Sequence, residues 1–322
     1  MRATLVEQTG GPEVLVAREV ATPAPGPGEI LVRHEAVGVN FIDVYYRDGT
    51  YPAPLPLVPG QEAAGTVVEA GPGAGFAPGD RVAYATALGA YAEYAVVPAA
   101  KAVPVPPGVS ARAAAAILLQ GLAAHYLSHT THPVGAADTV LVHAGAGGLG
   151  GLLVQFAAAR GATVLATAST EAKRETAREH GADFVLPYLE PERMRRQIEE
   201  LTGGGATVVY DSVGADTFES SLHALAPRGL LVLCGLSSGK VPPFDLERLR
   251  TLGSLKVTRP SLADHVRDRQ ALTGSAAAVL AHLADGRLRP RIHAELPLDE
   301  AAKAHELLES RATTGKLLLL PE

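Results

Sequence analysis

Residues 139–150 read Thr139-Val-Leu-Val-His-Ala-Gly-Ala-Gly-Gly-Leu-Gly150 and carry the most informative pattern in the chain. Residues 140–143 predict a short buried strand, and a predicted helix over residues 147–160 begins within the glycines. In such a unit the first glycine of a Gly-x-Gly-x-x-Gly pattern permits a tight turn. The second lets the backbone approach a pyrophosphate, and the third lets helix and strand pack closely. With the free N–H groups of the helix N-terminus, this predicts a dinucleotide-binding turn of Gly145, Ala146, Gly147, Gly148, Leu149 and Gly150.

The sequence after this turn indicates a larger sheet. A glycine-rich turn alone is weak evidence, but strand and helix patterns go on alternating to about residue 260. Strands are predicted near residues 140–143, 163–167, 184–186, 207–210, 230–234 and 254–258. Helices are predicted near residues 147–160, 170–180, 191–202 and 215–225. This alternation is typical of an α/β fold, so we expect a doubly wound parallel Rossmann sheet.

The two ends of the chain have a different pattern. Up to about residue 110, short apolar segments alternate with Pro- and Gly-rich breaks, which predicts a β-barrel-like domain followed by a helix over residues 110–127. After residue 260 the patterns predict a helix near 264–285, a strand near 288–295, a helix over 299–310 and a strand over 316–320. This last segment is too short for an independent enzyme domain, so we expect it to return to the first domain. The predicted domains are residues 1–115, 116–262 and 263–322.

The composition excludes several classes of function. The 322 residues carry a formal net charge of −6 and no basic run, which argues against nucleic acid or anionic membranes as main partners. The single cysteine, Cys234, allows neither a disulfide framework nor a cysteine-rich zinc lobe. The N-terminus lacks the apolar core of a signal peptide, and no apolar run is long enough to span a bilayer. We therefore expect a cytoplasmic protein.

Five further segments carry a family likeness. They are Gly38-Val-Asn-Phe-Ile-Asp-Val-Tyr45, Pro59-Gly-Gln-Glu-Ala-Ala-Gly65, Leu118-Leu-Gln-Gly-Leu122, Tyr210-Asp-Ser-Val-Gly214 and Val257-Thr-Arg-Pro-Ser261. With the glycine turn, they resemble the zeta-crystallin-like quinone oxidoreductases, which are zinc-free members of the medium-chain dehydrogenase/reductase superfamily. The resemblance covers nearly the full length. It implies a GroES-like catalytic domain at both chain ends, a Rossmann domain between them, and a homodimer joined through the sheet edge near residues 229–235 and 256–258.

The metal ligands of the zinc alcohol dehydrogenases in this superfamily are replaced here. Their Gly-His-Glu segment reads Gly60-Gln61-Glu62, and a glutamine amide is a poor zinc ligand. The cysteine ligand that the superfamily pattern places near residue 40 is Asn40. We therefore expect no metal. Without a Lewis acid to ionise an alcohol, the expected substrate is an acceptor that takes a hydride directly.

The end of the second predicted Rossmann strand indicates which nicotinamide cofactor binds. NAD-selective folds place a carboxylate there for the ribose 2′-OH, whereas this strand ends in Ala168-Ser169-Thr170. Ser169 can donate to a 2′-phosphate, Lys173 lies one helical turn further on, and the resemblance adds Tyr188. These residues predict NADPH as the cofactor. The alternative is that Ser169 and Thr170 only cap the helix while Lys173 is solvated.

The resemblance supplies the remaining candidates. It implies that Asn40 lies by the nicotinamide ribose and acts in catalysis together with Tyr45, and the alternative role of Asn40 is to cap a turn. Further cofactor contacts are expected at Ser212, Gly235, Leu236, Ser237 and Lys316. The expected substrate residues are Tyr45, Tyr46 and Arg259, with barrel packing as the alternative role of Tyr46.

The resemblance implies an NADPH-dependent quinone reductase. A quinone gains aromaticity on reduction, so this reaction requires no strong general acid from the protein. An NADPH-dependent alkenal or enone reductase, which reduces a conjugated C=C bond, uses the same fold and remains the alternative. A third hypothesis is a binding or structural role, as an RNA-binding or crystallin-like protein. The negative net charge of the chain argues against this role.

Overall fold

The computed structural model describes residues 1–321, which form two compact units. The terminal unit contains Met1–Leu122 and the chain from Val266 onward, and the central unit contains Ala123–His265. The long helix α2 (Ala111–Tyr126) crosses the first boundary. The predicted boundaries after residues 115 and 262 lie a few residues before those of the structure. At the first boundary the reason is that the continuous helix α2 gives no compositional signal where one unit ends.

The central unit is built on a six-stranded sheet in the order β10-β9-β8-β11-β12-β13, with every pair of neighbours parallel. Its strands are β8 (Thr139–Val142), β9 (Thr163–Thr167), β10 (Phe184–Leu186), β11 (Ala206–Asp211), β12 (Leu225–Leu233) and β13 (Lys256–Thr258). Its helices are α3 (Gly148–Ala159), α4 (Glu171–Glu179), α5 (Pro191–Thr202), α6 (Phe218–Ala224), α7 (Glu247–Thr251) and α8 (Leu262–His265), with the π-helix η3 (Leu127–Thr131) before β8.

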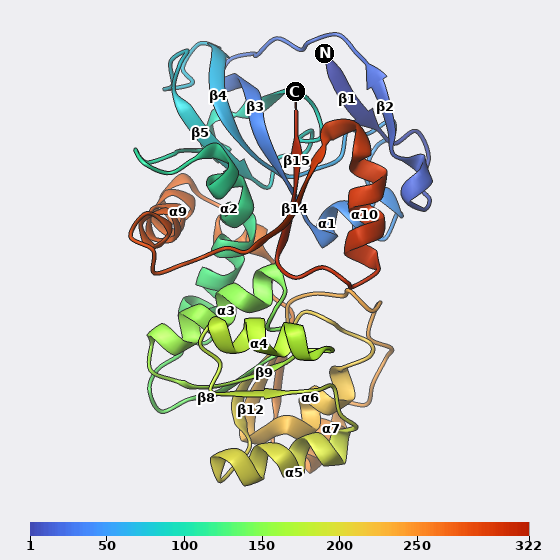
Figure 1. Cartoon of the computed structure of the whole chain (residues 1–322), viewed down its shortest axis with the longest axis vertical. Helices are drawn as coiled ribbons and strands as arrows, with labels where there is room; N and C mark the ends of the chain where they lie inside the picture. The colour runs from blue at the N-terminus through green and yellow to red at the C-terminus, as the bar shows by residue number, and fades with distance from the viewer. Residues whose placement is uncertain (322) are drawn as a thin grey trace. The chain divides into compact units, whose positions relative to one another are not determined.

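Within this unit, Figure 1 shows α3 and α4 on one face of the sheet and α5 and α6 on the other. The strand order reverses direction between β8 and β11, which is the switch point at which doubly wound sheets bind ligands. The prediction of a doubly wound parallel Rossmann sheet is confirmed. None of the helices in residues 1–321 combines the length and apolar composition needed to cross a membrane.

The terminal unit is built on a mixed sheet in which all pairs are antiparallel except β14 and β15, which pair in parallel. The main sheet has the order β14-β15-β3-β4-β5-β7, and β6 pairs with β3. Its strands are β3 (Glu29–Val39), β4 (Glu62–Ala70), β5 (Arg81–Ala85), β6 (Tyr94–Pro98), β7 (Ala102–Pro104), β14 (Ile292–Pro297) and β15 (Lys316–Leu320). β15 pairs antiparallel with β3, so the C-terminal segment completes the N-terminal sheet.

Smaller elements surround this sheet. A separate hairpin-like pair joins β1 (Arg2–Leu5) and β2 (Val16–Glu19). The helices of the unit are α1 (Phe41–Arg47), α9 (Arg269–Ala284) and α10 (Ala301–Glu309), and the 3-10 turns are η1 (Pro12–Val14), η2 (Ala99–Lys101) and η4 (Leu298–Glu300).

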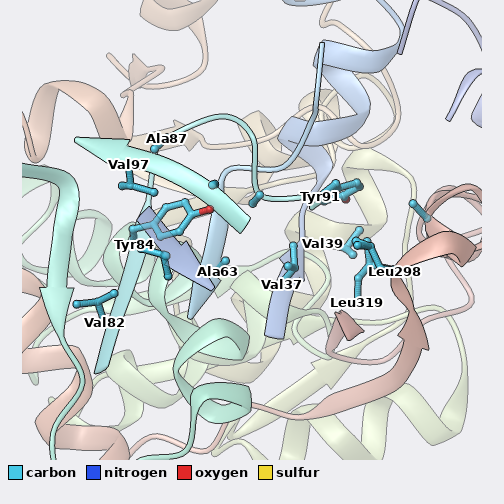
Figure 2. Packing of buried hydrophobic residues seen from close by; sticks show 14 of the residues in the cluster. Val37, Val39, Ala63, Val82, Tyr84, Ala87, Tyr91, Val97, Leu298 and Leu319 are labelled. Atoms are coloured by element: carbon cyan, nitrogen blue, oxygen red, sulfur yellow. The ribbon is translucent and has the colours of Figure 1, made fainter. Parts of the chain in front are cut away.

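The terminal unit has its own apolar core between the strands and α10. Valines, alanines and leucines of β3, β4, β5, β6 and β15 are fully buried there, together with the rings of Tyr84 and Tyr91 (Figure 2). Each fully buried valine or leucine side chain typically contributes about 1.5–3 kcal/mol to the free energy of unfolding. The two tyrosines carry hydroxyls into this core, and each hydroxyl has a hydrogen-bond partner.

The sequence-based description of local structure differs from the observed one in two places. The helix predicted over residues 264–285 is broken, because the side chain of Asp268 accepts a hydrogen bond from the N–H of Ala271 and begins α9 as a new helix. The segment after Asn40 forms the helix α1, which the sequence analysis did not predict. This helix matters for the site, because Asn40 stands at its N-terminus and Asp43 lies in its first turn.

Candidate functional site

The glycine turn lies between β8 and α3 at the switch point of the central sheet. A Cβ atom on Gly150 would lie 2.2 Å from the backbone oxygen of Ala144, and one on Gly145 would lie 2.6 Å from Cβ of Ala166. Neither contact is possible, so both positions require glycine. Gly147 caps α3, and its oxygen accepts the first helical hydrogen bond, from Gly151 at 2.8 Å.

The start of α3 fits a phosphate group. The N–H groups of residues 148–150 precede the first helical hydrogen bond and have no acceptor within the helix. Gly147, Gly148 and Leu149 are only half-buried, whereas Gly145, Ala146 and Gly150 are buried. The arrangement leaves backbone donors at an accessible helix N-terminus, which is the usual form of a pyrophosphate site.

The end of β9 holds the candidates for the 2′-phosphate. Thr170 caps α4, since its hydroxyl accepts a hydrogen bond from the N–H of Lys173 at 3.3 Å. Ser169 is exposed, and Lys173 is half-buried with a pKa lowered by desolvation. Glu171 is paired with Arg174 at 2.6 Å and with Arg178 at 3.1 Å. Because these arginines neutralise the negative charge of Glu171, this charge does not oppose the binding of a 2′-phosphate at Ser169 and Lys173.

Tyr188 follows β10 and is 41% exposed. Its ring lies parallel to that of His143, with 6.1 Å between centroids and 12° between planes. His143 is buried at the end of β8, and its Nδ1 lies 2.9 Å from the hydroxyl oxygen of Thr167. Desolvation lowers the pKa of His143, so the ring that supports Tyr188 is neutral.

The ends of β11 and β12 bring the next candidates together. The oxygen of Ser212 accepts a hydrogen bond from the N–H of Ser237 at 3.4 Å. A Cβ on Gly235 would lie 2.5 Å from that same oxygen, so glycine allows the two loops to touch. Leu236 between them is buried. Arg259 follows β13 and is exposed. All these residues lie at the carboxyl edge of the central sheet, where the glycine turn also lies.

Asn40 and Lys316 meet in the terminal unit. Lys316 Nζ donates to Asn40 Oδ1 and to Glu62 Oε2, each at 2.6 Å, and Asn40 Nδ2 donates to Glu62 Oε2 at 2.8 Å. All three side chains are at least 97% buried. Since lysine only donates and a carboxylate only accepts, these bonds fix which end of the Asn40 amide faces which partner. Gly38 makes the arrangement possible, because a Cβ there would lie 2.3 Å from Glu62 Oε2.

A second group of buried polar residues adjoins Asn40. Asp43 Oδ2 accepts hydrogen bonds from the N–H of Asn40 at 2.9 Å and from the hydroxyl of Tyr91 at 3.1 Å. The Tyr91 oxygen lies 2.9 Å from Nε2 of His305, whose Nδ1 lies 3.3 Å from the guanidinium of Arg47. Arg47 also pairs with Glu309 at 2.7 Å. Desolvation lowers the pKa of His305 to about 3, so this histidine is neutral.

The two predicted substrate tyrosines lie on α1 and are both half-buried. The ring of Tyr45 meets that of Tyr51 edge-on, with 5.3 Å between centroids. Tyr46 also contacts Tyr51, and it packs against the small apolar cluster of Val6, Leu15 and Leu57. The packing of Tyr46 therefore favours the structural alternative for that residue, while Tyr45 remains the candidate for the substrate.

The residues at the superfamily's zinc position do not fit a zinc ion. Among residues 1–321, no group of three or more His, Cys, Asp or Glu side chains is placed to hold a metal. The oxygens of Asn40 and Glu62 face a cation, but that cation is the Lys316 ammonium. A lysine ammonium cannot bind a metal ion and an asparagine amide is a poor zinc ligand, so a single carboxylate is left where a zinc site needs about three His, Cys or carboxylate ligands.

The site residues predicted from the sequence did not include Asp43, Tyr91, His305 or Arg47. A local signal existed only for Asp43, which stands three residues after the helix-capping Asn40, the spacing of a capping box. His305 is 214 residues from Tyr91 and 258 residues from Arg47. Contacts at such distances leave no periodicity or spacing in a single sequence.

Family models match both parts of the chain. Residues 26–107 match the alcohol dehydrogenase GroES-like domain, and residues 148–273 match the zinc-binding dehydrogenase family.

Individual relatives match over nearly the whole length. A quinone oxidoreductase of Pseudomonas aeruginosa is 44% identical over 97% of this chain and 97% of its own. A 2-haloacrylate reductase of a Burkholderia species is 40% identical over 99% of both chains. Among solved structures, Escherichia coli quinone oxidoreductase complexed with NADPH is similar with a TM-score of 0.96 and 42% identity over 100% of both chains.

Proposed function

Because this chain belongs to the quinone oxidoreductases of the medium-chain dehydrogenase/reductase superfamily, we propose that it reduces quinones with NADPH. In the balanced reaction, NADPH, one proton and a quinone give NADP⁺ and a hydroquinone. NADPH supplies a hydride when it is bound. The observation that carries the proposal is the glycine turn at the switch point together with the segment after β9, where Ser169 and Lys173 are present and the nearby carboxylate of Glu171 is paired with arginines.

The residues of the central unit are proposed to bind the cofactor. The N-terminus of α3 holds the pyrophosphate through the backbone of residues 147–150. Ser169, Lys173 and Tyr188 hold the 2′-phosphate. The nicotinamide ring lies next to two loops, one with Ser212 and one with residues 235–237. In the terminal unit, Asn40, oriented by Glu62 and Lys316, contacts the nicotinamide ribose. Tyr45 orients the acceptor oxygen by donating a hydrogen bond, and Arg259 borders the substrate.

Replacing Lys173 with alanine is expected to raise KM for NADPH by about tenfold and to leave KM for NADH within about twofold. The reason is that only NADPH has the 2′-phosphate that the ammonium contacts. Steady-state kinetics with both cofactors measures the difference. Lys303→Ala, which removes an exposed lysine of α10, is the control. An equal change for both cofactors would place Lys173 outside the 2′-phosphate site.

The acceptor is tested by following NADPH oxidation with 1,4-benzoquinone, 9,10-phenanthrenequinone and a conjugated enone in parallel. We expect rapid turnover of the quinones and slow turnover of the enone. The similarity to a 2-haloacrylate reductase keeps the reduction of activated C=C bonds as the second candidate function. Turnover of the enone alone would establish that second function and leave the cofactor assignment unchanged.

We also propose a homodimer that joins central sheets through β13. This strand is the last of its sheet, so within residues 1–321 one of its edges carries unpaired backbone groups. Residues 229–235 were also expected at this edge, but they lie largely in β12, which pairs with β11 on one side and β13 on the other. Leu246, which precedes the adjoining helix α7, is 69% exposed, and such a side chain is typical of an interface. Sedimentation equilibrium tests the proposal and would return the mass of one chain if it were wrong. A cytoplasmic location remains a prediction from the sequence.

A further inference from the structure

The hydrogen bonds around Asp43 all run in one direction. A guanidinium only donates, so the bond from Arg47 makes Nδ1 of His305 an acceptor and places the proton on Nε2. Nε2–H then donates to the Tyr91 oxygen at 2.9 Å, and the Tyr91 hydroxyl donates to Asp43 Oδ2 at 3.1 Å. The Asn40 N–H donates to the same oxygen. The chain of donors from Arg47 through His305 and Tyr91 therefore ends at Asp43 Oδ2, which accepts the Asn40 N–H as well.

Asp43, Glu62 and Lys316 form a cluster of buried ionisable side chains, and its charges do not balance if both carboxyls are ionised. Asp43, Glu62 and Lys316 are buried together, so one ammonium faces two acids. Both oxygens of Glu62 are bonded, Oε1 to the N–H of Leu119 and Oε2 to Lys316 and Asn40. By contrast, Oδ1 of Asp43 is buried and has no hydrogen-bond partner within residues 1–321. Because an unpaired buried charge is costly, the proton that neutralises the cluster belongs on Asp43.

Electrostatics agree with this assignment. Desolvation raises the pKa of Asp43 to about 7, although the bonds from Asn40 and Tyr91 and the charge of Lys316 act against it. The charge of Glu62 raises this pKa further. The groups that face Asp43 are thus Asn40, Tyr91, Lys316 and Glu62, while His305 and Arg47 act through Tyr91.

We propose that Asp43 is a positioning residue that holds a proton and so keeps the cluster beneath Asn40 neutral, and that Tyr91 sets how tightly this proton is held. The inference rests on the proposed function, because it takes Asn40 to contact the nicotinamide ribose. Ionised Asp43 adds a negative charge beside Asn40 and opposes the negative charge that the acceptor oxygen gains during reduction. Quinone reduction is therefore fastest with Asp43 protonated, and it slows as pH rises through the pKa of this group.

The pH profile of kcat with saturating NADPH and quinone tests the proposal between about pH 5.5 and about pH 9. We expect the rate of the wild-type enzyme to fall with a midpoint near pH 7, and the profile of Asp43→Asn to be flat there. Tyr91→Phe removes a bond to the ionised form and is expected to raise the midpoint by about one pH unit. Tyr84→Phe is the matched control, since it removes a buried hydroxyl bonded to His34 in the same core.

Infrared spectroscopy tests the proton on Asp43 without an activity assay. We expect a protonated-carboxyl band in the wild-type protein that disappears with the same midpoint, is missing in Asp43→Asn and titrates at higher pH in Tyr91→Phe. If this band is the same in Asp43→Asn, or if Tyr91→Phe and Tyr84→Phe share one midpoint, the proposal is overturned. It is also overturned if the band titrates as expected while Asp43→Asn keeps the wild-type pH profile. If the protein reduces no quinone, the proposed function fails, and the infrared titration still decides where the proton lies.

Discussion

Replacing Lys316 with methionine is expected to lower the free energy of unfolding by about 3–5 kcal/mol. Methionine fills a similar volume but removes the ammonium that contacts Glu62, and it leaves the Oδ1 of Asn40 without the hydrogen bond from Lys316. The loss is large because both partners are fully buried, so water cannot replace the ammonium. Urea denaturation followed by circular dichroism measures the change.

Two further variants separate this charge effect from simple loss of packing. The double variant Lys316→Met with Glu62→Gln removes both charges and is expected to recover about half or more of the lost stability. Lys303→Met breaks the exposed pair with Glu300, whose side chains are 58% and 38% exposed, and is expected to cost less than about 1 kcal/mol. A double variant less stable than Lys316→Met would show that the buried pair is not the source of the effect.

Replacing Gly150 with alanine is expected to weaken NADPH binding by at least about tenfold and to lower the free energy of unfolding by about 1–3 kcal/mol. The new Cβ would lie 2.2 Å from the oxygen of Ala144, so the turn or the first turn of α3 must shift. That shift moves the N–H groups that are proposed to hold the pyrophosphate. Fluorescence titration with NADPH and thermal unfolding measure the two effects.

The control for this variant is Gly204→Ala in the same unit. Apart from its chain neighbours, no heavy atom of residues 1–321 lies within 4 Å of a Cβ at Gly204, and this glycine belongs to the turn between α5 and β11. We expect wild-type NADPH affinity in Gly204→Ala. Unchanged affinity in Gly150→Ala, with the protein folded, would mean that this turn does not bind the pyrophosphate.

Local patterns in the sequence were sufficient to predict the central unit. A glycine turn, apolar runs of strand length and helices of matching length lie next to one another in the chain, and parallel strands joined by helices have few possible arrangements. The expected strands therefore match β8 to β13 closely. The boundary between the units was less well predicted, because α2 continues through it.

The candidate site likewise has one part that the sequence predicted and another part that only the structure revealed. The positions of the glycine turn, Ser169 and Lys173 follow from the order of strands and helices, so the sequence alone determined them. Asn40 and Lys316 were named separately, but only the tertiary structure brought them together across 276 residues, with Glu62 between them.

The tertiary structure alone also decided the protonation and orientation of the site. Whether Asp43 holds a proton depends on desolvation and on partners that come from β4, β15, α10 and the loop with Tyr91. Each of these contacts joins residues far apart in the chain, and none repeats with a helical or strand period. Burial and charge compensation are properties of the packed unit, so they appear only when distant segments occupy the same volume.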